Sequence, residues 1–167
     1  MTDEPTHDPA GLTGPPERPA APAAPPAAPP AAPRMRITGL HHATLISADL
    51  QRTTTFYRDV LGLALWREGV SDDDPGARHF WFAADTSGAP GTLISFLEYP
   101  QMAAGTQGTG ATHHLALAVA SAQEVAAWRD YLRGRDVPAT EVFERGGLAS
   151  VYLRDPDGHI LEICAPA

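Results

Sequence analysis

The chain has 167 residues, a formal net charge of -8 at pH 7 and a single cysteine, Cys164. An acidic chain without a basic stripe is a poor candidate for binding nucleic acid or an anionic membrane, and one cysteine excludes an intramolecular disulfide. No apolar run approaches the length of a transmembrane helix, so we expect a soluble protein of the reducing cytoplasm.

Residues 1–34 differ in composition from the rest of the chain. They hold eleven of the 17 prolines, interspersed with alanine, glycine and acids. Such a sequence buries little apolar surface and favours extended polyproline structure, so we expect a disordered or semi-stiff tail. It lacks the basic start and apolar core of a signal peptide. The remaining residues, 35–167, suffice for one domain with its own core but hardly for two.

That domain reads as two copies of one unit, module one at residues 36–101 and module two at residues 110–165. An offset of 72 residues, as from His42 to His114, brings similar residues into register. The matched pairs are His41 with His113, His42 with His114, Phe56 with Trp128, and Gly62 with Gly134. The repeat indicates that both halves fold alike.

Each copy opens with a β-prone run, at residues 40–46 or 112–119, followed by a helix-capping residue, Asp49 or Ser121. Apolar residues then recur at helical spacing up to a closing glycine, Gly62 or Gly134. Further strands are predicted at residues 63–70, 78–84 and 92–99, and at residues 139–143, 148–153 and 160–164. The pattern strand, helix, strand, strand, strand, used twice, predicts an α+β fold whose two sheets enclose a cavity.

Strand parity selects three candidate metal ligands. In the run 112–119, His114 shares a face with small residues while the bulky apolar residues take the other face, which we expect to pack on the helix. His114 then points into the cavity, and the repeat gives His42 the same role. Glu162 lies in the otherwise apolar last strand, where a carboxylate is costly to bury without a cation or metal. The symmetry of the halves makes that last strand the neighbour of the first.

Two histidines and one carboxylate form the ligand set typical of non-haem Fe(II), which leaves positions open for substrate and O2. The same set suits Mn(II), and zinc with water in the fourth place. Ser95 is the counterpart of Glu162 in module one, so no fourth protein ligand is expected there. The alternative is a binding domain that keeps these histidines for hydrogen bonds.

The chain resembles the vicinal oxygen chelate superfamily, which includes glyoxalases, fosfomycin-resistance proteins and type I extradiol dioxygenases. The resemblance covers residues 36–165 and rests on the duplicated unit and on three motifs. These are Gly-Leu-His-His-Ala-Thr at residues 39–44, Phe-Tyr-Arg-Asp-Val-Leu-Gly at residues 56–62, and Asp-Pro-Asp-Gly at residues 155–158 with Glu162. The resemblance implies two βαβββ modules that form a cupped mixed sheet around a metal site.

Within the superfamily the sequence is most similar to extradiol dioxygenases acting on hydroquinones. The similarity implies cleavage of a small aromatic diol with O2, and the metal Fe(II), with Mn(II), Zn(II) or Ni(II) as alternatives. It implies the ligands His42, His114 and Glu162, surrounded by five further residues that serve the reaction. Those residues are His41, Thr44, His113, Arg145 and Tyr152.

The roles expected for these residues follow from their chemistry. Tyr152 would hydrogen-bond the reacting oxygens, His41 or His113 would move protons, and Arg145 would anchor a remote substituent. Two rival functions stay open: a non-redox lyase or transferase like the glyoxalases and fosfomycin-resistance proteins, and a metal-free protein that sequesters a drug. The hydroquinone enzymes are about twice as long, with four modules, whereas this chain has two. Either its two modules close on one another, or two chains exchange modules in a homodimer.

Overall fold

The computed structural model describes residues 36–167, and these contain all the helices and strands reported below. Residues 38–167 form one compact unit. The tail predicted at residues 1–34 lies outside the described residues. Within residues 36–167, no helix is long and apolar enough to cross a membrane.

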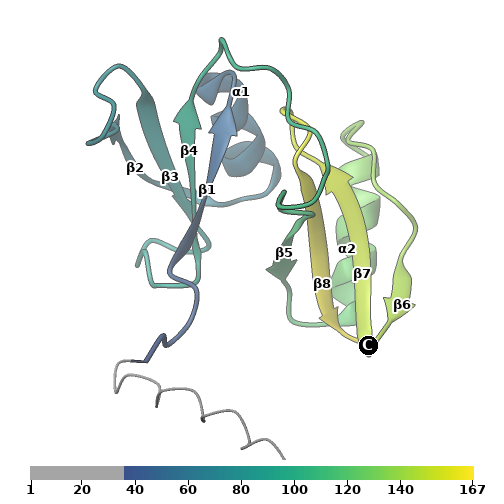
Figure 1. Cartoon of the computed structure of the whole chain (residues 1–167). Helices are drawn as coiled ribbons and strands as arrows, with labels where there is room; N and C mark the ends of the chain where they lie inside the picture. Colours follow the sequence, from purple (N-terminus) through teal and green to yellow (C-terminus); the bar gives the residue numbers. More distant parts are fainter. Residues whose placement is uncertain (1–35) are drawn as a thin grey trace, which may run out of the picture. The chain divides into compact units, whose positions relative to one another are not determined.

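Two four-stranded mixed sheets, each with its own helix, form this unit (Figure 1). Module one runs β1 (His42–Ser47), α1 (Leu50–Thr54), η1 (Thr55–Val60), β2 (Ala64–Val70), β3 (Arg78–Ala83) and β4 (Leu93–Glu98). Module two runs β5 (Leu115–Ala118), α2 (Ala122–Arg133), β6 (Phe143–Arg145), β7 (Leu148–Arg154) and β8 (Ile160–Pro166). The strand orders β1-β4-β3-β2 and β5-β8-β7-β6 are equivalent. The predicted repeat of two βαβββ modules is confirmed.

In both sheets the first strand of the module is the neighbour of the last, as the sequence predicted, and the two run parallel. The pairing aligns Thr44 with Ser95 in module one, and Ala116 with Glu162 in module two. Because Ala116 lies 72 residues after Thr44, these two pairs occupy the same place in the repeat. Ser95 is therefore the structural counterpart of Glu162.

The helices begin where the capping residues predict. The Asp49 carboxylate accepts hydrogen bonds from the backbone N–H groups of Gln51 and Arg52, and the Ser121 hydroxyl accepts one from Glu124. The first helix continues from α1 into η1, a π-helix whose wider turn ends at Leu61, before Gly62 with φ 75°.

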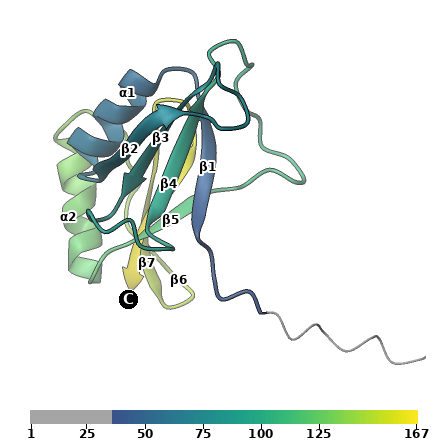
Figure 2. The same ribbon diagram turned by 90° about the vertical axis from the view of Figure 1, so that its left-hand side faces the viewer.

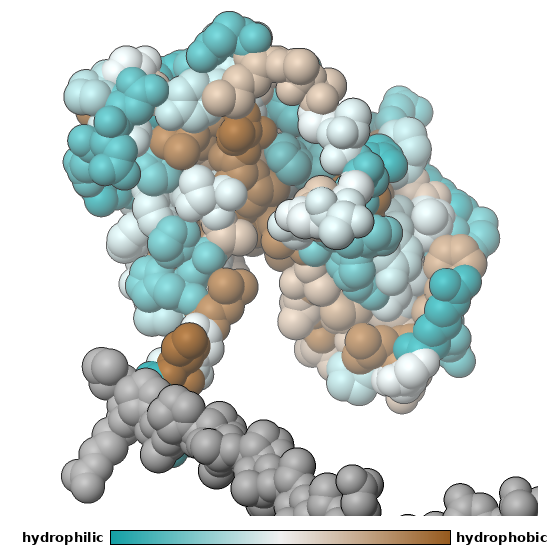
Figure 3. Space-filling model, viewed as in Figure 1, coloured by the Kyte–Doolittle hydropathy of each residue, from teal (hydrophilic) through white to brown (hydrophobic). Residues whose placement is uncertain are grey.

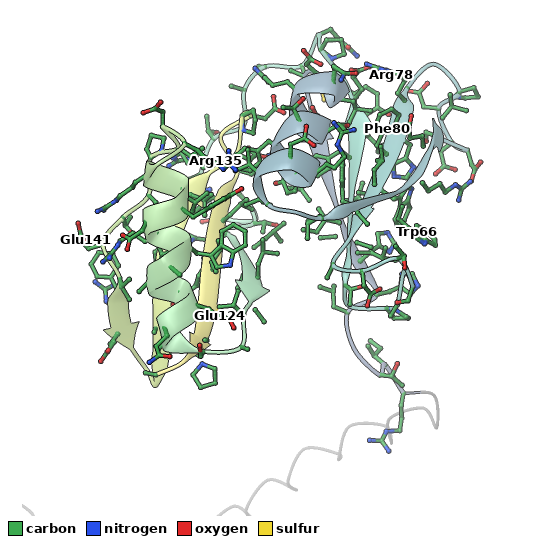
Figure 4. The ribbon with its side chains drawn as sticks, turned by 180° about the vertical axis from the view of Figure 1, so that it is seen from behind. Trp66, Arg78, Phe80, Glu124, Arg135 and Glu141 are labelled. Atoms are coloured by element: carbon green, nitrogen blue, oxygen red, sulfur yellow. The ribbon has the colours of Figure 1, made fainter. Side chains whose placement is uncertain are left out.

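The helices cover one face of the sheets and leave the other face bare, as Figures 1, 2 and 4 show from three directions. The side chains between helices and sheets form one apolar core. Its largest fully buried members are Tyr57, Phe82, Phe96, Leu50, Leu132, Leu161, Val125 and Val151. Each contributes about 1.5–3 kcal/mol by leaving water. The core thus fixes the positions of the strands whose uncovered faces can carry a functional site.

The Asp-Pro-Asp-Gly turn between β7 and β8 connects module two to module one. The Asp155 carboxylate accepts hydrogen bonds from the backbone N–H groups of Asp157 and His159, while Gly158 has φ 93°. The Tyr57 hydroxyl, from η1, donates to Asp155 Oδ2 at 3.0 Å. The Arg52 guanidinium, from α1, pairs with Asp157. A turn predicted from local chemistry therefore also joins the two modules.

The strand predicted at residues 139–143 is wrong for most of its length. Ala139 forms only an isolated bridge with Leu153, and β6 begins at Phe143. The Ala139 carbonyl instead accepts hydrogen bonds from the Arg133 guanidinium, and the Thr140 hydroxyl accepts the Tyr152 N–H. The side chains of Arg133 and Thr140 thus bind the backbone groups of Ala139 and Tyr152 that a longer β6–β7 pairing would use. The run predicted from residue 112 also starts late, at Leu115, so His114 lies just before β5.

Candidate functional site

The bare face of the second sheet carries a cavity of about 790 Å³. Aromatic, cationic and small apolar side chains line it. They are His113, His114, Pro138, Ala139, Thr140, Phe143, Arg145, Tyr152, Leu153, Arg154 and Ile160. Four of these residues were predicted as site residues from the sequence: His113, His114, Arg145 and Tyr152. The structure brings them together around one space.

Glu162 lies beneath this cavity, on β8, between His114 and Tyr152. His114 Nε2 is 2.9 Å from Glu162 Oε2, and the Tyr152 hydroxyl donates to Glu162 Oε1 at 3.0 Å. The Glu162 side chain is only 8% exposed, whereas that of His114 is 33% exposed. A buried carboxylate needs partners for both oxygens, and here an imidazole and a phenol supply them.

His113 holds the other side of the His114 ring. Its Nδ1 is 2.8 Å from His114 Nδ1, so one of the two nitrogens carries the proton of that bond. The two rings meet edge to face at an interplanar angle of 85°. With its Nδ1 engaged by His113, His114 directs Nε2 at Glu162. This is the arrangement by which a neighbouring group orients a metal-binding histidine.

Tyr152 keeps its proton at neutral pH in this setting. Burial raises the pKa of its phenol, and the hydrogen bond to Glu162 and the negative charge there raise it further. The hydroxyl is therefore a donor that an oxygen entering the cavity would meet. Cys164 follows on the same face of β8, where burial and the charge of Glu162 raise the pKa of its thiol. A thiol protonated in this way is a poor nucleophile.

Of the remaining predicted residues, His42 and Thr44 lie on the bare face of the first sheet and His41 directly precedes β1. The ring of His42 packs on Trp81 at a centroid distance of 4.8 Å, and its Nδ1 is 3.0 Å from His41 Nδ1. Thr44 Oγ1 is 2.9 Å from Ser95 Oγ. Module one thus repeats the paired histidines of module two, but a serine stands in place of the carboxylate. His41, His42 and Thr44 do not line the cavity of module two.

The register also identifies a residue that the sequence analysis missed. Trp81 pairs with Ser95, as Tyr152 pairs with Glu162, so the indole and the phenol occupy equivalent places. Beside Trp81 lies His79, at a centroid distance of 4.9 Å. Burial lowers the pKa of His79, helped by the nearby charge of Arg67. The alternation of side chains along residues 78–84 could have predicted this pair, because His79 and Trp81 lie on the same face of β3.

Two more lining residues, Phe143 and Arg154, were also missed. Arg154 follows Tyr152 by two residues on β7 and so points to the same side of the sheet. Phe143 was assigned to the end of a strand that does not form as predicted.

Glu98, at the end of β4, does not line this cavity. It pairs with Arg78 and accepts a hydrogen bond from the Leu50 N–H at the start of α1. Figure 4 shows Arg78 and Phe80 beside one another in this module.

The chemistry of these donors fits a divalent metal in part. A neutral imidazole nitrogen and a carboxylate oxygen are ligands that Fe(II), Mn(II) and zinc share, and His114 and Glu162 already converge. The two atoms that would bind the metal, His114 Nε2 and Glu162 Oε2, are hydrogen-bonded to each other. Among residues 36–167, however, no three His, Cys, Asp or Glu side chains gather closely enough to hold a metal. In one chain the pair lacks the predicted third donor, His42.

The sequence of residues 39–163 matches the family described as "Glyoxalase/Bleomycin resistance protein/Dioxygenase superfamily". The "Putative ring-cleaving dioxygenase MhqO" of Bacillus subtilis (strain 168) is 38% identical over 125 residues, which are 75% of this chain and 39% of that protein. Its homologue MhqA, with the same description, is 28% identical over 131 residues, 78% of this chain and 41% of that protein. The chain therefore spans about two fifths of the length of these relatives.

Solved structures show the same fold. A "putative dioxygenase" from Bacillus subtilis subsp. subtilis str. 168 has a TM-score of 0.70 at 37% identity, over 75% of this chain and 40% of that one. A mutant of the fosfomycin resistance protein FosX from Listeria monocytogenes, complexed with Mn(II) and a dihydroxypropylphosphonic acid, has a TM-score of 0.60 at 23% identity. That match covers 79% of this chain and 95% of FosX.

Proposed function

This chain belongs to the glyoxalase/bleomycin resistance protein/dioxygenase superfamily, and on that premise we propose that it is a metal-dependent extradiol-type dioxygenase that cleaves a small aromatic diol with O2. The observation that carries the proposal is the convergence of His114 and Glu162 beneath a cavity, with Tyr152 bonded to the second carboxylate oxygen. The 38% identity to MhqO supports the ring-cleaving class.

His114 and Glu162 would bind the metal, for which Fe(II) is our first choice. A bound Fe(II) supplies the redox chemistry that lets a diol react with O2. The chain's own residues position the reactants. Tyr152 would donate its proton to an oxygen of the substrate, and His113 would hold His114 in the orientation that presents Nε2. The apolar part of the cavity lining would contact the ring of the substrate.

We further propose that a second copy of the chain supplies the third ligand, His42. Both sheets leave one face bare, and His42 lies on one such face while the His114 and Glu162 pair lies on the other. Apolar side chains remain exposed on these faces: Ile46 by 44%, Phe143 by 38% and Leu148 by 42%. Figure 3 shows hydrophobic surface over both modules from this side. Two copies that lay module one on the partner's module two would cover it and complete the donor set.

Mixing two inactive variants tests the shared site. His42→Ala removes the donor of module one, and His114→Ala removes that of module two. If sites form between chains, a mixed dimer has one intact site, so refolding the variants together restores metal binding that neither has alone. If mixed dimers form without restored binding, the shared site is refuted. If His42→Ala alone binds metal as well as the wild type, His42 is not the third ligand.

The reaction is tested with Fe(II)-loaded protein, a panel of hydroquinones and catechols, and an oxygen electrode. We expect O2 uptake matched by a ring-opened product. Metal-bound protein that consumes no O2 across the panel would sink the dioxygenase proposal. The alternative, a non-redox lyase or transferase, would instead act with a metal such as Mn(II), which the FosX structure contains, under argon. Ser95 adds no carboxylate at the position that repeats Glu162, so the donor set suits Fe(II) and Mn(II) alike, and the dependence on O2 decides between the two functions.

A further inference from the structure

The cavity of module two carries positive charge in a chain that is acidic as a whole. Two arginines, Arg145 and Arg154, line it, and the only carboxylate that the described residues bring against its lining is Glu162, which is covered by His114 and Tyr152. The formal net charge of the chain is -8. A cationic concavity on an acidic protein concentrates small anions at one place, because the rest of the surface repels them.

These two arginines also differ from most of the others in the described part of the chain. Arg52, Arg58, Arg78, Arg129 and Arg133 each pair with a carboxylate. Neither Arg145 nor Arg154 pairs with a carboxylate of residues 36–167. Arg154 donates one bond to the Gly158 carbonyl, and the guanidinium of Arg145 lies 5.0 Å from the centre of the Phe143 ring. Their remaining N–H groups are free to bind an anion.

Phe143 and Tyr152 link Arg145 to the proposed metal position. The ring of Phe143 lies 6.5 Å from that of Tyr152, and Tyr152 bonds Glu162. A planar ring held beside these aromatics would have its hydroxyl groups near Tyr152 and its far substituent near Arg145. A guanidinium presents two parallel N–H donors that match the two oxygens of a carboxylate.

We infer that the substrate is an aromatic acid, a diol whose ring carries a carboxylate, and that Arg145 binds this carboxylate. The diol part of the inference rests on the proposed function, whereas the carboxylate site rests on the cavity alone. This goes beyond an anchor for an unspecified substituent, because it gives the substituent a negative charge.

Binding is measured by calorimetry with the full chain under argon, so the result does not depend on turnover. The probes are hydroquinone and 2,5-dihydroxybenzoate, which share the diol ring and differ by the carboxylate. We expect the acid to bind at least about tenfold more tightly at low salt, and Arg145→Ala to remove most of that preference. Arg145→Lys, which keeps the charge without the paired donors, should restore part of it.

Arg135→Ala is the matched control. Arg135 also lies over an aromatic ring, 4.6 Å from the centre of Tyr131, but it follows the end of α2 outside the cavity (Figure 4). It should leave the preference unchanged. Equal binding of the two probes to the wild type, or an equal loss in the Arg135 and Arg145 variants, would overturn the inference. A protein that prefers the acid yet consumes no O2 when iron-loaded would keep the carboxylate site and refute the dioxygenase.

Discussion

Tyr57→Phe tests the contact by which the two modules hold one another. Tyr57 is fully buried, and its hydroxyl donates to Asp155 Oδ2 at 3.0 Å. The substitution keeps the ring in the core and removes only that donor. A hydrogen bond to a charged group contributes about 1.5–3 kcal/mol. His159 Nδ1, 2.9 Å from the same oxygen, still partners it in the variant, so we expect the lower part of that range, about 2 kcal/mol.

Urea denaturation measures this loss as a lower midpoint at an unchanged slope. In a thermal scan it corresponds to a fall in Tm of roughly 6–10 °C for a domain of this size. Tyr99→Phe is the control, because the Tyr99 hydroxyl also donates to an aspartate, Asp74, but at the surface. We expect no measurable loss there. If the two variants lose equal stability, the buried bond does not hold the modules together as argued.

Two further changes test other parts of the fold. The hydrogen bond that His159 donates to the Asp155 carboxylate raises the pKa of His159 above its ordinary 6.5, against the effect of burial, so the protonated form stabilises the folded state. This contribution is fully present below about pH 6.5 and is lost as the pH rises through the pKa of the folded state. The urea midpoint of the wild type should therefore fall as the pH rises above about 6.5, and this fall should be smaller in His159→Asn. Gly88 has φ 62°, and an added methyl group would meet the Trp66 indole. Gly88→Ala should cost about 1 kcal/mol or more and shift tryptophan fluorescence, while Gly105→Ala, in open space, should change neither.

The sequence predicts the architecture because each element is specified locally and then repeated. Asp49 and Ser121 place the helix starts, and the 72-residue offset relates the two modules. Parity along the strands predicts that His114 and Glu162 face the same side, and the parallel pairing of β5 with β8 brings them together. The alternation of side chains along each strand and the 72-residue repeat are enough for these conclusions.

What the sequence does not predict depends on contacts between distant residues. The strand expected at residues 139–143 loses its backbone partners to Arg133 and Thr140, which no local pattern reveals. The π-helix after Thr54 has no composition signal of its own. His42 has the same local pattern as His114, yet it lies beside Trp81 rather than beside Glu162. Symmetry equates the two histidines but cannot say whether they meet in one chain.

Metal content is the most direct test of the central claim, a metal site built on His114 and Glu162. The purified full-length protein is dialysed against Fe(II) or Mn(II) under argon, and bound metal per chain is measured for the wild type, Glu162→Gln and the control Glu98→Gln. We predict about one metal per chain in the wild type and in the control, and little in Glu162→Gln at unchanged circular dichroism. A wild type without stoichiometric metal, or a Glu162→Gln variant that binds as much as the wild type, would contradict the account.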